Sequence, residues 1–357
     1  MTRRTGFTLI ELVISMAVLG LVSFFLTELL VRQSRTYTVV DDVTEAQQNL
    51  RAVTTLLERE LRATGFLAPE GAAICGWDTG GAGTPDDDPD VVYVSDSDAL
   101  DPAGVTSLSA QAVDITSGYG DGDGVETLTL ASLVVDANPF YDLDGDGVAE
   151  SDFLYTGTPE RTGGVIVVDR NNPAAGASCG VITDINVAAS TLTVDFNIST
   201  APNAPAGGAA DGGTQIGGPV TDLVAVPAHV YWINPNDPDG PPQLIRDGMV
   251  LANDVEDLQL ALFYDLNDDG AVSALESPGS DAQEYEPGGF DNGFLREVRV
   301  TVVARTRSQD PDVLVDPDLA RGVTQGFENR PAGVVPDGFR RRSITLTVQP
   351  RNVDRVL

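Results

Sequence analysis

The chain of 357 residues contains no lysine, one histidine and two cysteines, and these shortages exclude several kinds of active site. A Ser-His-Asp triad and a histidine-based zinc site would both depend on His229, which we expect instead to pack within a strand. Acidic side chains are so numerous that no single pair of carboxylates stands out as a catalytic dyad. We therefore predict that the chain is not an enzyme.

Basic residues are scarce as well. All 21 are arginine, and with 54 acidic residues they give a formal charge of −33. Residues 1–64 hold seven of each sign, so the whole deficit lies beyond residue 64. Such an acidic surface repels nucleic-acid phosphates and anionic lipid headgroups, so we predict no nucleic-acid binding by the distal part and expect cations to suit it. The densest basic cluster, Arg340–Arg342, is expected to be solvated charge at a strand edge, and the alternative is that it pairs with the acidic face of a neighbouring molecule.

Both cysteines, Cys75 and Cys179, lie in the distal part, and each stands beside a glycine. In an exported protein a lone pair of cysteines usually forms one disulfide. The alternative is two unpaired side chains that act as small apolar residues.

One long apolar run is present. It follows Arg3 and Arg4, extends from Phe7 to Val31, and is long enough to span a bilayer with its start in the cytoplasm. No small-residue cleavage site follows the run, so we expect it to remain on the mature protein. Glu11 interrupts it, and a carboxylate without a partner would cost roughly 2.5–3.5 kcal/mol at mid-membrane. Glu11 therefore needs a partner.

The fold class is predicted to be α+β, with one long N-terminal helix and a large β-rich head. The helix should cover residues 7–64, because apolar residues recur at three- and four-residue steps up to Leu61 and Gly65 is a natural stop. Its second half should lay the Val43–Leu61 face on the head, residues 65–357, where β-rich runs alternate with Gly, Pro, Asp and Asn. The candidate strands are Val91–Ser95, Thr127–Val135, Gly164–Asp169, Thr191–Phe196, Val224–Ile233, Leu258–Tyr264, Glu297–Arg307 and Ser343–Gln349.

An acidic loop in the head fits the calcium pattern D-x-[DN]-x-[DN]-G-x5-E at every specified position. Calcium prefers six to eight hard oxygen ligands, which side chains at alternate positions, one backbone carbonyl and a closing glutamate can supply. No pair of flanking helices is evident, so we expect structural Ca²⁺ in an isolated loop between strands. The alternative is a solvated turn without metal. The predicted ligands are Asp265, Asn267, Asp269, Ala271 and Glu276.

A second acidic loop matches the first part of the same pattern. Phe153 stands where the closing glutamate would be, so Asp152 or Glu150 would have to replace it. A metal site and a metal-free turn remain equally open for this loop. Its candidate ligands are Asp142, Asp144, Asp146, Val148 and Asp152.

The segment Gly6-Phe7-Thr8-Leu9-Ile10-Glu11-Leu12 resembles the type IV prepilin motif. The resemblance implies that residues 1–6 are a leader, that a prepilin peptidase cuts between Gly6 and Phe7, and that Phe7 is N-methylated. It also implies that Glu11 pairs with the N-terminal amine of a neighbouring pilin subunit in a filament. The alternative from the residues alone is a plain signal anchor with a glutamate near its start.

Three distal segments resemble the PilW family of minor pilins: Val255–Tyr264 before its acidic turn, Leu295–Arg307, and Arg341–Asn352. This resemblance implies a low-abundance subunit that primes assembly or lies at the tip of a type IV pilus, with attachment or twitching as the downstream activity. It implies insertion in the inner membrane before assembly, then a cell-surface pilus with a periplasmic or extracellular head. Alternatives are a J-type pseudopilin of type II secretion and a filament-presented adhesin.

Overall fold

The structure is a computed structural model that describes residues 8–65, 68–69, 71–77, 89–95, 112–120, 124–131, 163–172, 177–186, 189–196, 221–235, 240–265, 294–310, 313 and 337–350. One long helix, α1 (Leu9–Ala63), precedes all the strands. The predicted fold class, a long N-terminal helix followed by a β-rich head, is confirmed. The chain divides into two compact units, residues 1–45 and 46–357, which are described separately.

The first unit is helical over its described part. The large apolar side chains from Leu9 to Val31 are about half or more exposed. By length and composition alone, α1 is the one helix in the described part of the chain that could cross a membrane. An exposed apolar surface of this length needs a lipid or protein partner.

The second unit begins with the C-terminal turns of α1. Leu50, Val53, Leu57 and Leu61 are almost fully buried there and lie on one face at three- and four-residue spacing. They share a core cluster with Leu258 and other residues of a three-stranded antiparallel sheet. The helix ends before Gly65, whose φ of 74° lies in the left-handed region where a side chain would be strained. Helix and sheet therefore stabilise each other through this apolar face.

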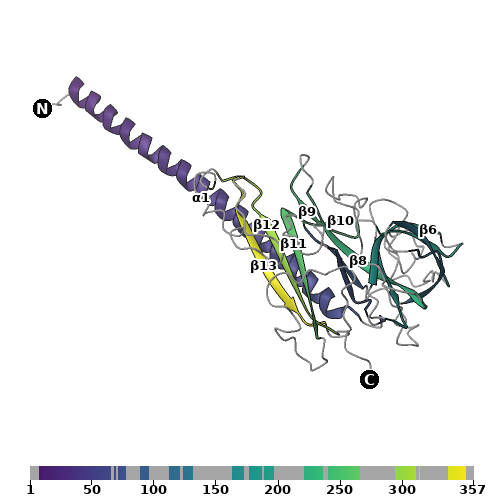
Figure 1. Cartoon of the computed structure of the whole chain (residues 1–357). Coiled ribbons are helices and arrows are strands. Elements are labelled where there is room, and N and C mark those ends of the chain that lie inside the picture. Colours follow the sequence, from purple (N-terminus) through teal and green to yellow (C-terminus); the bar gives the residue numbers. More distant parts are fainter. Residues whose placement is uncertain are drawn as a thin grey trace, which may run out of the picture. The chain divides into compact units, whose positions relative to one another are not determined.

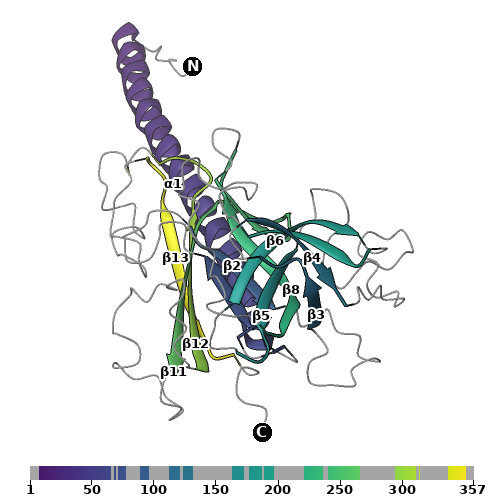
Figure 2. The same cartoon turned by 45° about the vertical axis from the view of Figure 1, so that its right-hand side comes forward.

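The three-stranded sheet has the order β11 (Val255–Asp265), β12 (Phe294–Arg305) and β13 (Arg341–Val348). Figure 2 shows these strands side by side. Alternate residues such as Val298, Val300 and Val302 enter the core with the helix, as the two-residue period of a strand requires. The predicted strands in this region overlap all three.

A second sheet contains the remaining ten strands, of which β8 is the longest. The first half of β8 pairs with β3 and β5, and the second half pairs with β2 and β9. The strands are β1 (Ile74–Trp77), β2 (Val91–Ser95), β3 (Val113–Ser117), β4 (Val125–Leu130), β5 (Gly164–Asp169), β6 (Ala177–Asn186), β7 (Thr191–Asp195), β8 (Leu223–Asn234), β9 (Gln243–Arg246) and β10 (Met249–Asn253).

Six strands of this sheet close into a barrel. The antiparallel order β8-β3-β4-β7-β6-β5 returns to β8, because β5 also pairs with β8. The ring is visible around β6 in Figure 1. Its interior is filled by apolar side chains including Leu128, Ile182, Leu192 and Phe196, so the barrel is a packed core and not a channel. Closure removes the exposed strand edges that an open sheet would present.

The eight predicted strands each overlap an observed strand, but β1, β3, β6, β9 and β10 were not predicted. The strand expected at Thr127–Val135 is β4, which ends earlier, at Leu130. β6 was missed because Ser178, Gly180 and Asp184 break its apolar pattern. It is a strand because β5 and β7 pair with it on its two sides.

Candidate functional site

The first candidate site is the start of α1. Thr8 and Glu11 form a reciprocal cap: the Thr8 N–H and hydroxyl donate to Glu11 Oε2 at 3.0 and 2.9 Å, and the Glu11 N–H donates to Thr8 Oγ1 at 3.4 Å. This is a capping box, which satisfies backbone N–H groups that the first turn leaves open. The sequence reasoning missed it, although Thr-x-x-Glu before an apolar run is its signal.

The capping box leaves part of the Glu11 carboxylate available. Among the described residues, only Oε2 accepts a hydrogen bond, and the neighbouring apolar side chains Ile10 and Leu12 are mostly exposed. The carboxylate therefore lies on an apolar helix surface with one oxygen able to accept a further donor. A cationic donor would neutralise its charge, which a low-dielectric surrounding strongly favours.

Other polar side chains of the apolar run bond to the helix itself. The Ser15 hydroxyl donates to the Glu11 carbonyl at 2.7 Å, and the Thr27 hydroxyl donates to the Ser23 carbonyl at 2.9 Å. Such bonds satisfy a hydroxyl without water. At the far end of the run, Glu28 and Arg32 form an exposed ion pair at 2.7 Å. Among the described residues of this segment, Glu11 is thus the charged side chain that forms no ion pair.

Most of the predicted metal ligands, and the leader cleavage site, lie outside the described residues. These are Gly6 and Phe7, the first-loop positions Asn267, Asp269, Ala271 and Glu276, and the second-loop positions Asp142, Asp144, Asp146, Val148 and Asp152. Asp265 is the last residue of β11, and its backbone pairs with Phe294 at the start of β12. The first acidic loop therefore connects two adjacent antiparallel strands, as expected. Within the described ranges, no three His, Cys, Asp or Glu side chains gather as a metal site.

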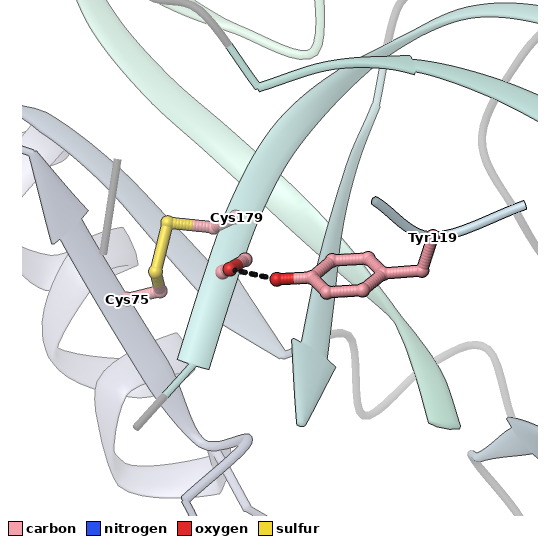
Figure 3. Close-up of a disulfide and its surroundings, with 4 residues drawn as sticks. Cys75, Tyr119 and Cys179 are labelled. Atoms are coloured by element: carbon pink, nitrogen blue, oxygen red, sulfur yellow. Dashed lines mark hydrogen bonds between the residues drawn. A yellow bond between two sulfur atoms is a disulfide. The ribbon is translucent and has the colours of Figure 1, made fainter. Parts of the chain in front are cut away.

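The predicted disulfide is confirmed. Cys75 in β1 and Cys179 in β6 are bonded, with their Cα atoms 6.2 Å apart (Figure 3). The bond is buried and joins β6 of the barrel to β1, which lies outside the barrel and pairs with β2. Beside it, the Tyr119 hydroxyl lies 2.7 Å from Ser178 Oγ and its ring packs edge-on against Phe196. This corner therefore holds the barrel against the rest of the sheet.

His229 packs within β8, as predicted. Its Nδ1 lies 2.7 Å from Asp247 Oδ2, in the turn between β9 and β10. Next to it, Arg246 contacts Glu60 of α1 at 2.8 Å, and the Tyr231 hydroxyl donates to the Glu60 carboxylate. These polar contacts connect α1, β8 and the β9–β10 hairpin. His229 therefore has a structural role where these three elements meet.

The expectation of solvated charge at Arg340–Arg342 was wrong for Arg341, which is only 4% exposed. Its guanidinium contacts the carboxylates of Glu256 and Asp337. Arg340 pairs with Asp310 at 2.6 Å. Burial alone raises the Asp337 pKa, but hydrogen bonds from Arg341 and from the Phe339 N–H outweigh it and lower the pKa overall. The cluster anchors β13 within its own head.

Comparison with known proteins identifies the N-terminal segment. Residues 1–27 match the prokaryotic N-terminal methylation motif. No curated protein matches the chain. A solved type IV-like pilin from Thermus thermophilus aligns over 89% of this chain and 99% of its own, with 11% identity and a TM-score of 0.27, which is too low to establish a shared head fold.

The match includes most of the apolar run at the start of α1, the helix that is long and apolar enough to cross a membrane. Residues 1–27 therefore carry a prokaryotic N-terminal methylation motif, and the part of it from Leu9 onward forms the start of α1.

Proposed function

We propose that this chain is a PilW-type minor pilin of a type IV pilus, which primes assembly or lies at the filament tip. The observation that carries the proposal is the methylation motif at residues 1–27, continuous with a helix whose apolar side chains are exposed from Leu9 to Val31. A bilayer can hold this helix before assembly, and the apolar core of a filament can hold it afterwards. The head would be periplasmic first and extracellular later.

Glu11 supplies the chemistry of assembly in this proposal. Cleavage after Gly6 would expose the Phe7 amine, which stays cationic after N-methylation. Glu11 Oε2 already accepts hydrogen bonds from Thr8, so the other carboxylate oxygen would accept a hydrogen bond from the cationic amine of a neighbouring subunit. Two charges that are each costly in an apolar surrounding thereby neutralise each other.

The size and composition of the head support the proposed position at a filament end. Residues 46–357 contain a helix-packed sheet and, in addition, a closed barrel with its own apolar core. A barrel of this kind is not needed to cover the helix, and its bulk is easiest to accommodate where no subunit follows. The same feature supports a second role as an adhesin, since a separately packed barrel can present a binding surface.

A deletion strain tests the proposal. We expect the loss of surface pili, and restoration by the wild-type gene, because a priming subunit is required before the shaft forms. Piliation is scored by electron microscopy and by the amount of sheared filament protein. Secreted enzymes serve as the control: their loss with normal pili would contradict the proposal and indicate the J-type pseudopilin. Normal pili with lost attachment would leave only the adhesin role.

We further propose that Ca²⁺ stabilises the acidic loop between β11 and β12. What supports this is the fit of residues 265–276 to the calcium pattern and the position of Asp265 at the end of a strand whose neighbour starts at Phe294. Calcium would lock the connection between two strands that form the core with α1. The second acidic loop, Asp142–Asp152, is a further candidate for the same ion.

Calcium removal gives a direct test on the full chain in detergent. We expect EGTA to lower the melting temperature, because an ion bound only by the folded state stabilises it by mass action. Glu276→Gln should have a lower melting temperature in calcium and respond little to EGTA, whereas Glu126→Gln serves as a matched control in the barrel. An unchanged wild-type melting temperature in EGTA would contradict a structural role for both loops.

A further inference from the structure

The face of the three-stranded sheet that is turned away from α1 carries buried polar side chains. Val298, Val300 and Val302 of β12 belong to the core cluster of the helix, so the alternating residue Thr301 lies on the opposite face. Gln259 of β11 stands directly across from Thr301, because the two are register partners. Thr301 is 1% exposed and Gln259 is 0% exposed. A hydroxyl and a primary carboxamide are therefore held on neighbouring strands, away from water.

Two further side chains complete this group. Asp257 precedes Gln259 by two residues on the same face of β11 and is 1% exposed. Its Oδ1 accepts a hydrogen bond from Gln259 Nε2 at 3.0 Å. On the other side, Thr345 of β13 is the register partner of Thr301, and the two hydroxyl oxygens lie 3.0 Å apart. A carboxyl group thus contacts the nitrogen of the amide, and a second hydroxyl contacts the Thr301 hydroxyl.

These groups are the ones that an acyl transfer requires. A threonine hydroxyl becomes a nucleophile when a base takes its proton, and the carboxamide of glutamine is an acyl group. The amide nitrogen is a poor leaving group unless an acid within hydrogen-bond distance protonates it. Directly opposite residues place their Cβ atoms about 4.5–5.5 Å apart, so side-chain rotation can bring Thr301 Oγ1 to Gln259 Cδ. Burial excludes the water that would hydrolyse the product.

We propose that Thr301 and Gln259 form an ester bond that joins β11 to β12. Thr301 Oγ1 attacks Gln259 Cδ, and the hydroxyl proton passes to the carboxylate of Asp257, a diagonal neighbour on the same face. The Oγ1–Cδ bond forms, the Cδ–Nε2 bond breaks, and Asp257 gives the proton to the leaving nitrogen. Ammonia is the only product released, so no co-reactant is consumed and Asp257 returns to its starting state. The reaction occurs once per chain, which makes it a self-modification and not the turnover of a substrate.

The ester strengthens the sheet that packs on α1. The hydrogen bonds between β11 and β12 can open one after another, whereas a covalent bond within the ladder fixes the register and keeps the two strands together. It also closes the chain between the strands, which reduces the entropy of the unfolded state as a disulfide does. The inference is independent of the proposed function, because it depends only on side chains within the head.

Peptide mapping of the full chain, purified in detergent, tests the bond. Trypsin cuts after arginine, so Gln259 lies in the peptide 247–296 and Thr301 in the peptide 300–305. We expect mass spectrometry to find the two peptides joined, at the sum of their masses less about 17 Da for the ammonia that acyl transfer releases. Alkaline hydroxylamine cleaves esters and spares amides, so it should separate them and leave a hydroxamate at Gln259.

Three results of this mapping would overturn the proposal. The first is separate peptides at their full masses. The second is a loss of ammonia within the peptide 247–296 alone, since that loss needs no second strand. The third is a joined pair that resists hydroxylamine, because such a bond is not an ester.

Substitutions separate the chemistry from the packing. Thr301→Val keeps the shape of the side chain and removes the nucleophile, so the joined peptides should disappear. Asp257→Asn removes the base and should lower the joined fraction at least about tenfold. Thr345→Val is the matched control in the same row of side chains and should leave the bond in place. The melting temperature should be lower in Thr301→Val than in Thr345→Val. Joined peptides in Thr301→Val, or a wild-type yield in Asp257→Asn, would contradict the assigned chemistry.

Discussion

Replacement of Glu11 by alanine should leave the chain in the membrane but exclude it from filaments. Insertion becomes easier, because a carboxylate in the apolar run costs roughly 2.5–3.5 kcal/mol at mid-membrane. Assembly loses the group that neutralises the amine of the neighbouring subunit, and an amine left unpaired in an apolar core is strongly unfavourable. Membrane fractionation measures insertion, and immunoblots of sheared filaments measure incorporation. We expect incorporation to fall by more than about tenfold, which corresponds to about 1.4 kcal/mol.

Two further variants separate the charge of Glu11 from its role in the helix cap. Glu11→Gln keeps a side chain that can bond to the Thr8 N–H, since glutamine also serves in a capping box, but it removes the charge. Thr8→Ala removes the cap, at a cost of about 1 kcal/mol, and keeps the charge. We expect Glu11→Gln to be excluded from filaments and Thr8→Ala to be incorporated. Normal incorporation of Glu11→Gln would show that capping, and not charge pairing, is what Glu11 provides.

Removal of the disulfide by Cys75→Ala with Cys179→Ala should lower the free energy of unfolding by about 2–5 kcal/mol. The bond closes a loop across a sequence separation of 104 residues, and a loop of this length loses much entropy when it is cross-linked in the unfolded chain. Both cysteines are buried, so the substitutions also remove two sulfur atoms from the core around Ile166 and Val226. Urea unfolding of the full chain in detergent measures the change.

Hydrogen exchange can locate the effect. Because the bond joins β1 to β6, its removal in the double variant should accelerate amide hydrogen exchange more in β6 and β5 than in β12. β12 packs against α1 in another core cluster. Reduction of the wild-type chain with dithiothreitol in mild urea should reproduce the double variant. Thr183→Ala, an exposed change on the same strand, is the control and should alter stability little. An unchanged free energy of unfolding in the double variant would contradict the structural role of the bond.

Prediction from sequence worked best for features whose determinants are local. The helix period of Leu50, Val53, Leu57 and Leu61 placed one long helix within two residues of its observed ends, because burial of one face requires that spacing. Strands with continuous apolar runs, such as Gly164–Asp169, were placed at their observed bounds. The negative charge of the head and the disulfide between the two cysteines were also predicted without knowledge of the fold.

Features that depend on distant partners were not predictable in the same way. Arg341 lies in a basic cluster that suggests solvent exposure, yet it is buried and pairs with Asp337, four residues away, and with Glu256, 85 residues away on β11. The β9–β10 hairpin was missed although Asp247-Gly248 is a strong turn signal, because the flanking strands are short.

The sequence by itself determined the N-terminal design: a motif for methylation, an apolar helix, and one acid within it. Local spacing suffices there, because the helix pattern and the motif are read along a single continuous segment. Only the tertiary structure decided that the head contains a closed barrel, that β8 belongs to both the barrel and the rest of the sheet, and that the disulfide holds them together. The physical reason is that barrel closure and the disulfide depend on contacts between residues far apart in the chain, such as the β3–β8 pairing and the 104-residue separation of Cys75 and Cys179, which no local pattern encodes.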